Sequence, residues 1–334
     1  MSASHGAIAR RNPAGNPRIA VYLAVPLILA LAAIGVASAE VPPGVTRVSA
    51  ADAERAGSAI HLTQRPVGGS TLVEVKASTT GIRLLAVSAD GTEVALADQL
   101  GEASGSLTLA EIDGEQLRIA MPGLLAASFA ADGTWLAVID GRGALWRVEA
   151  PSGRSALLAD GPFIGSPVIE GDGSLLVLAV PSVEAPYQSR LVRLQPATGS
   201  VMRLSEEELV YGAFPLDDGD LAIVAHETDG TVVHRLTGAG ERLLVDLGLG
   251  AVNVAVAGNG RIAFERTGEG IYVVDLPGPA ARRIGAGSQP CFGPDGSSVL
   301  IRRAEQALAL DLDGSVLAVS DEPAGFAASA ECMP

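Results

Sequence analysis

Residues 124–162 read LLAASFAADGTWLAVIDGRGALWRVEAPSGRSALLADGP, and this stretch decides the fold. A small-residue apolar run leads into a tight turn at Asp132-Gly133. Three short runs rich in Val, Leu, Ile and Trp follow, over residues 134–139, 144–149 and 154–159. Each run is too short for a helix, so the pattern predicts four antiparallel strands. One small sheet of this kind cannot bury both of its faces alone, and it needs copies of itself.

The chain supplies these copies as a repeat. An Asp-Gly or Asn-Gly turn followed by three strand-like runs recurs roughly every 40 residues from residue 81 onward, which is typical of propeller blades. The dipeptide is expected because a tight hairpin needs positive φ, which Gly, Asn and Asp adopt at low cost. The six turns are Asp90-Gly91, Asp132-Gly133, Asp172-Gly173, Asp218-Gly219, Asn259-Gly260 and Asp295-Gly296. We therefore predict an all-β propeller of four-stranded antiparallel blades with six complete repeats.

The two ends of the chain predict one further blade. The tail Gly325 to Cys332 (GFAASAEC) has the pattern of a first strand, and residues 59–63 and 71–77 have the pattern of strands that could lie beside it. A composite blade built from both termini would close the ring and remove exposed sheet edges. The sequence thus favours seven blades over six.

Two of the turns carry a wider motif. Phe292-Gly293-Pro294-Asp295-Gly296 and Phe129-Ala130-Ala131-Asp132-Gly133 resemble the F-S-P-D-G motif of the TolB-like (PD40, WD40-like) β-propeller family. The motif's Ser is replaced here by Gly293 or Ala130. The resemblance covers roughly residues 81–320 and implies a propeller. The family's namesake also has an α/β domain before its propeller, and residues 40–80 are too few for one.

The N-terminus has the pattern of an export signal. Residues 1–18 carry three Arg and no acid, residues 19–36 are uncharged and apolar, and Ala37-Ser38-Ala39 follows. This order predicts a signal peptide over residues 1–39, and the alternative is an uncleaved N-terminal anchor. Residues 40–56 are then a linker with a short helical turn, and residues 57–334 a single propeller domain. Either alternative places the propeller outside the cytoplasm: secreted, periplasmic or anchored to the membrane by its N-terminus.

Composition restricts the partners. The net charge of −15 argues against nucleic acid, because phosphate binding needs basic patches. Aromatic residues are only 4%, so extensive stacking platforms are not expected. We expect a monomer that meets a membrane only through an uncleaved N-terminal segment. Its partner would be an envelope protein or a glycan ligand.

Cysteines and exposed loops supply the candidate site residues. Two Cys in an exported chain, Cys291 and Cys332, predict one disulfide, and the alternative is two buried thiols. The acidic run Glu206-Glu207-Glu208 and Tyr187, in a ten-residue insertion, are candidate rim contacts. Their alternative readings are a solvated loop and a plain long hairpin. Trp135 and Trp146 lie inside strands and are expected to pack between blades.

Sequence signatures of catalysis are weak. The chain has no G-x-S-x-G elbow, no P-loop and no G-x-G-x-x-G after a strand. His61, His226 and His234 show no close ligand spacing, and we expect neither a cofactor nor a metal. Only first strands are expected to line the channel, whereas His226 ends a second strand and His234 lies in a third.

These observations predict a protein-binding or scaffold module of the cell envelope without catalysis. Its rim loops and central channel would be presented to a protein or glycan ligand. The alternative is a propeller-type enzyme, such as a lactonase, lyase or hydrolase, with its site at the central channel.

Overall fold

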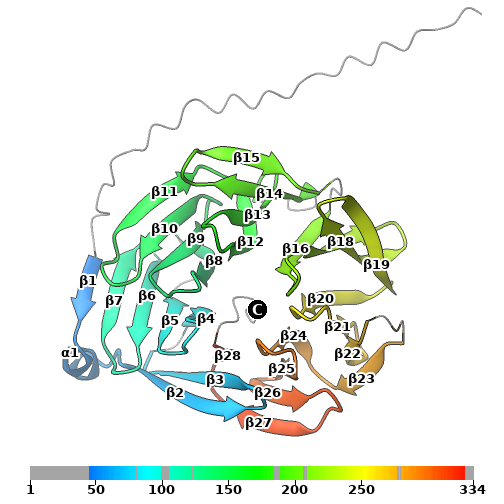
Figure 1. The fold of residues 1–334 in the computed structure, drawn as a ribbon. Coiled ribbons are helices and arrows are strands. Elements are labelled where there is room, and N and C mark those ends of the chain that lie inside the picture. The colour runs from blue at the N-terminus through cyan, green and yellow to red at the C-terminus, as the bar shows by residue number, and fades with distance from the viewer. Residues whose placement is uncertain are drawn as a thin grey trace, which may run out of the picture. The chain divides into compact units, whose positions relative to one another are not determined.

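The structure is a computed structural model that describes residues 45–327 except 80, 99–104, 122, 184–187, 206–208, 277 and 279. Figure 1 shows the described strands as small sheets arranged in a ring around a common centre. The described residues form seven such sheets, each antiparallel, so the protein is a seven-bladed β-propeller. This confirms the predicted fold class, including the seventh blade.

Six blades follow one another along the chain, each beginning with its innermost strand. Blade 2 contains β4 (Arg83–Val87), β5 (Glu93–Ala97), β6 (Ser106–Glu111) and β7 (Gln116–Ala120). Blade 3 contains β8 (Leu124–Phe129), β9 (Trp135–Asp140), β10 (Leu145–Glu149) and β11 (Ser155–Ala159). Blade 4 contains β12 (Phe163–Ile169), β13 (Leu175–Ala179), β14 (Arg190–Gln195) and β15 (Ser200–Arg203).

The second half of the ring repeats this order. Blade 5 contains β16 (Val210–Pro215), β17 (Leu221–Glu227), β18 (Gly230–Thr237) and β19 (Gly240–Gly248). Blade 6 contains β20 (Ala251–Val256), β21 (Ile262–Arg266), β22 (Gly270–Val274) and β23 (Arg282–Gly285). Blade 7 contains β24 (Ser288–Phe292), β25 (Ser298–Arg303), β26 (Gln306–Asp311) and β27 (Val316–Ser320).

Blade 1 closes the ring from both ends of the chain. β2 (Ile60–Val67) pairs with β3 (Ser70–Ala77), and β3 pairs with β28 (Ala324–Phe326). The Phe326 side chain is fully buried among Val67, Leu72 and residues of blade 7. The C-terminal strand thereby covers an edge that β3 would otherwise expose.

The region before β2 also adds to a blade. Within residues 40–56, predicted as a linker with a helical turn, β1 (Val45–Val48) pairs antiparallel with β7 as a fifth strand of blade 2. The six-residue helix α1 (Ala50–Arg55) follows, and the Ser49 hydroxyl accepts from the Asp52 N–H as its N-cap. Among the described residues no helix is long and apolar enough to cross a bilayer. The predicted signal or anchor over residues 1–39 lies outside the described residues.

The Asp-Gly turns have the predicted local chemistry. Gly91 and Gly133 adopt φ of 75° and 69°. The Asp132 carboxylate accepts hydrogen bonds from the Thr134 N–H at 3.0 Å and the Thr134 hydroxyl at 2.8 Å. These donors lower the pKa of the Asp132 carboxyl, because they favour its charged form. The turn therefore stabilises its own geometry through contacts between residues two positions apart.

Hydrophobic side chains fill the spaces between blades. Trp135 packs in a cluster with Phe163 and Leu175 of blade 4, while Trp146 packs against a cluster that includes Leu107 and Leu109 of blade 2. The two Trp residues thus lie between blades, as predicted. Blade faces that could not be buried within one sheet are buried against the next.

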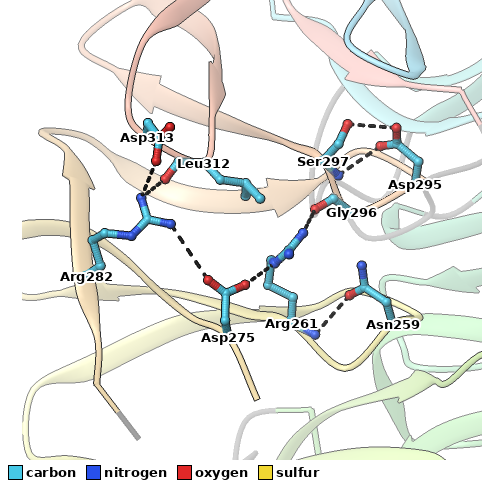
Figure 2. Close-up of polar contacts among 9 residues, drawn as sticks. All are labelled: Asn259, Arg261, Asp275, Arg282, Asp295, Gly296, Ser297, Leu312 and Asp313. Carbon is cyan, nitrogen blue, oxygen red and sulfur yellow. Dashed lines mark hydrogen bonds and ion pairs between the residues drawn. The ribbon is translucent and has the colours of Figure 1, made fainter. Parts of the chain in front are cut away.

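Polar contacts also join blades 6 and 7 (Figure 2). Arg261 is held by its own turn, where its backbone N–H donates to the Asn259 side-chain oxygen at 3.0 Å. Its guanidinium donates to the Gly296 carbonyl in the turn of blade 7 at 2.6 Å and also to Asp275. Arg282 binds Asp275 as well, and its other nitrogen lies 3.3 Å from Asp313 of blade 7.

Replacing Arg261 by Met is expected to lower the free energy of unfolding by about 1–2 kcal/mol. The substitution keeps the apolar stem and removes a charge-assisted hydrogen bond between blades. Urea unfolding measures the change. Arg242→Met on β19 is the matched control, because Arg242 is exposed and makes no side-chain hydrogen bond or ion pair within the described part of the chain. Equal losses in the two variants would contradict the role given to Arg261.

Candidate functional site

A cavity of about 990 Å³ lies at the centre of the ring, and its lining comes from the inner strands of several blades. Its lining includes the starts of first strands, such as Arg83, Leu125 and Tyr211. None of the six Asp-Gly or Asn-Gly turns contributes to it. Because those turns follow the ends of first strands, the cavity opens on the face opposite to them. We call this opening the mouth.

Second strands reach the mouth as well, which corrects the expectation that only first strands line the channel. His226 near the end of β17 and Arg302 near the end of β25 line the cavity. The reason lies in the first strands, which in blades 2 to 7 all shift register against the second strand. Such β-bulges bend a strand and re-aim its side chains, so the neighbouring strand end can reach the channel.

The three histidines in the described part of the chain, His61, His226 and His234, do not converge. His226 lies at the mouth, with its ring 6.1 Å from that of Tyr211 in an edge-on arrangement. The Nε2 atom of His234 is 3.0 Å from a Glu227 carboxylate oxygen, and the Nε2 atom of His61 is 3.0 Å from Glu54. Among the described residues, no group of three or more His, Cys, Asp or Glu side chains is placed to hold a metal ion.

Three exposed apolar side chains of blades 5 and 6 line the mouth or lie next to a lining residue. Tyr211 is 58% exposed and Val252 is 40% exposed, and both line the cavity. Leu249, at 74% exposure, directly precedes the lining residue Gly250. We call Tyr211, Leu249 and Val252 the mouth patch. Apolar groups gathered beside a large cavity are typical of an interaction surface.

A polar cluster adjoins the mouth patch on blades 6 and 7. Asn253 on β20 and Gln289 on β24 both line the cavity, and both are non-glycine residues with positive φ, 48° and 52°. One Glu265 carboxylate oxygen accepts from the Asn253 side-chain amide at 2.7 Å and from the Gln289 backbone N–H at 3.3 Å. A left-handed conformation costs a residue such as Gln about 1 kcal/mol or more, so the surrounding structure must hold it.

Most of the predicted contacts lie outside the described residues. This holds for Tyr187, for Glu206, Glu207 and Glu208, and for Cys332. Cys291 is described: it is 2% exposed on β24, beside the cavity. Its pairing with Cys332 stays a prediction. Sequence reasoning missed Asn253 and Gln289, although a polar residue within an apolar first strand was a visible signal.

Comparison with known proteins places the fold but no family. No protein-family model and no curated protein matches the chain. Among solved structures, TolB from Acinetobacter baumannii is 16% identical at a TM-score of 0.53, over 84% of this chain and 86% of TolB. An oligogalacturonate lyase in complex with manganese is 13% identical at a TM-score of 0.57, over 81% of this chain and 84% of the lyase.

A third structure widens the range of functions. The tricorn protease is 9% identical at a TM-score of 0.57, over 86% of this chain but only 36% of the protease. At such identities the similarity shows the fold alone. Because enzymes stand beside TolB among these structures, the fold does not decide between binding and catalysis.

Proposed function

We propose that this chain is an exported binding module of the cell envelope that takes a protein ligand at the mouth of its central cavity. The mouth patch is the observation that carries the proposal. Tyr211 offers a large amphipathic surface, and Tyr is enriched among the residues that dominate binding energy at interfaces. Val252 and Leu249 extend the apolar area beside it.

Polar groups complete an interface of the usual composition around this patch. Arg302, Glu305 and Asp321 line the same cavity, so charges of both signs are present beside the apolar residues. Protein interfaces combine an apolar centre with a polar rim in this way. The acidic chain, with a net charge of −15, favours partners that carry a basic patch.

An affinity pull-down of the tagged full chain from envelope extract tests this function. We expect one protein partner in stoichiometric amount, and the Tyr211→Ser/Val252→Ser variant should weaken its binding at least about tenfold. Leu157→Ser/Val201→Ser is the matched control, because these apolar residues are 45% and 41% exposed but lie on the outer strands β11 and β15.

Other outcomes would contradict the proposal. A partner retained by the mouth variant would place the interface elsewhere. A tightly bound metal without a protein partner would favour the enzyme alternative and direct attention to His226 and the carboxylates of the mouth. Export is tested on the same sample, since the recovered chain should begin at Glu40 when the signal is cleaved.

A further inference from the structure

Two residues of the mouth are held in a conformation that their side chains disfavour. The non-glycine residues with positive φ in the described part of the chain are Asn253, Gln289 and Ala304. Asn253 and Gln289 lie on the innermost strands of neighbouring blades, and both line the cavity. Ala304 does not line it. Left-handed residues persist where the surrounding structure holds them, and they concentrate at functional sites.

The same carboxylate supports both positions from behind. Glu265 lies near the end of the second strand β21 and accepts from the Asn253 side chain and the Gln289 backbone, while it does not itself line the cavity. β20 and β24 each shift register around these residues, between Val252 and Ala255 and between Ser288 and Cys291. A glycine at either position would adopt the same backbone without strain. The chain carries amide side chains there instead.

These amides have unused hydrogen-bonding capacity. The Gln289 side chain makes no hydrogen bond within the described residues, and Asn253 uses only its nitrogen, toward Glu265. A side-chain amide offers one carbonyl acceptor and an N–H donor, the same pair of groups that a peptide unit offers. Two such amides on adjacent inner strands can therefore hydrogen-bond to successive peptide groups of an extended chain.

We propose that Asn253 and Gln289 form an amide pair that binds the main chain of an extended polypeptide segment inserted into the mouth. The inference rests on the proposed function and names the part of the site that would contact the ligand backbone. The mouth patch would take the ligand's apolar side chains, and the amide pair would fix the register of its backbone, as main-chain hydrogen bonds do in strand addition.

The surroundings favour a polypeptide over a sugar or a small ion. The aromatic residues of the cavity lining are Tyr211, Phe214 and His226, and Phe214 is 8% exposed, so a stacking platform for sugar rings is small. Arg302, Glu305, Asp321 and Glu322 all line the cavity, so the lining carries charges of both signs and does not favour a small anion. The amide side chains and the neighbouring apolar side chains of the mouth are complementary to the peptide groups and apolar side chains of a polypeptide.

The test uses glycine substitutions that keep the backbone and remove the amide. A library of random peptides displayed on phage is selected on the immobilised full chain, and the best peptide is synthesised and measured by calorimetry. We expect Asn253→Gly and Gln289→Gly each to lower the affinity for this peptide at least about tenfold. The melting temperature of Gln289→Gly should rise by about 2 °C or more, because strain is relieved. Ala304→Gly is the matched control: it relieves the same kind of strain and should leave peptide affinity unchanged.

Each outcome of these measurements either supports or overturns the amide pair. Loss of affinity in both glycine variants at unchanged or higher stability, with Ala304→Gly unaffected, supports the amide pair. Affinity that falls in Tyr211→Ser/Val252→Ser but not in the glycine variants overturns the amide pair and leaves the proposed function in place. If the wild-type chain selects no peptide and binds oligosaccharides on a glycan array instead, both proposals are overturned.

Discussion

Replacing Phe326 by alanine is expected to lower the free energy of unfolding by about 3–5 kcal/mol, the range for a Phe side chain removed from a packed core. Phe326 has an exposed fraction of 0% and packs with Leu72 of blade 1 and Leu300 of blade 7. It belongs to the short strand β28, whose three residues pair with β3 and complete blade 1 from the C-terminal side. The cavity left by the substitution therefore loosens the strand that closes the ring.

Hydrogen exchange distinguishes loss of closure from general destabilisation. The Val75 N–H donates to the Pro323 carbonyl at 2.8 Å, immediately before β28. In Phe326→Ala this amide should exchange faster than global unfolding allows, because β28 can detach while the other blades remain folded. Phe264→Ala is the matched control: Phe264 is equally buried, but it packs with residues of blades 5 and 6. There the Val75 amide should follow global stability. Equal protection of Val75 in the two variants would contradict local opening.

Closure of the ring was predictable because it follows from the repeated strand pattern and from the need to pair exposed sheet edges. The Asp-Gly turns recur with strand-like runs at a nearly constant interval, and each turn draws its geometry from residues two positions apart, such as Asp132 and Thr134. Local chemistry of this kind is visible in a sequence. The seventh blade followed from a tail that resembles a first strand and from the argument that unpaired edges are avoided.

The mouth was less predictable because its residues come from strands far apart in the chain. Tyr211, Asn253 and Gln289 meet only when three successive blades are placed around the channel. The bulges that aim them depend on the partner strand's register, which no local pattern states. His226 was not expected to line the channel, because the bulges that let the end of a second strand reach it are not visible in the sequence. The strand β1 was missed because four residues in a polar segment do not reveal that β7 has room for a fifth strand.

Glu93 carries the clearest dependence of stability on pH. It lies on β5 directly opposite Glu111 of β6, near the Asp90 turn. Burial raises the pKa of the Glu93 carboxyl to about 7, and the negative charges of Glu111 and Asp90 add to the shift. Burial also raises the pKa of Glu111, against the opposing influence of Arg47. The folded protein therefore holds a proton on Glu93 that the unfolded chain releases at lower pH.

Substituting Glu93 by Gln is expected to stabilise the protein above neutral pH. The pKa of Glu93 is raised from 4.5 to about 7 in the folded state, so its neutral form favours folding and stability falls as pH rises between these values. The full linkage is at most about 3 kcal/mol, and because solvent reaches part of this side chain we expect a gain of about 1–2 kcal/mol at pH 8. Near pH 4.5 the gain should vanish, since the wild-type carboxyl is then protonated in the folded state. Urea unfolding at the two pH values measures this, with Asp229→Asn in an exposed turn as the control. A gain that is the same at both pH values would show that the side chain's charge is not its cause.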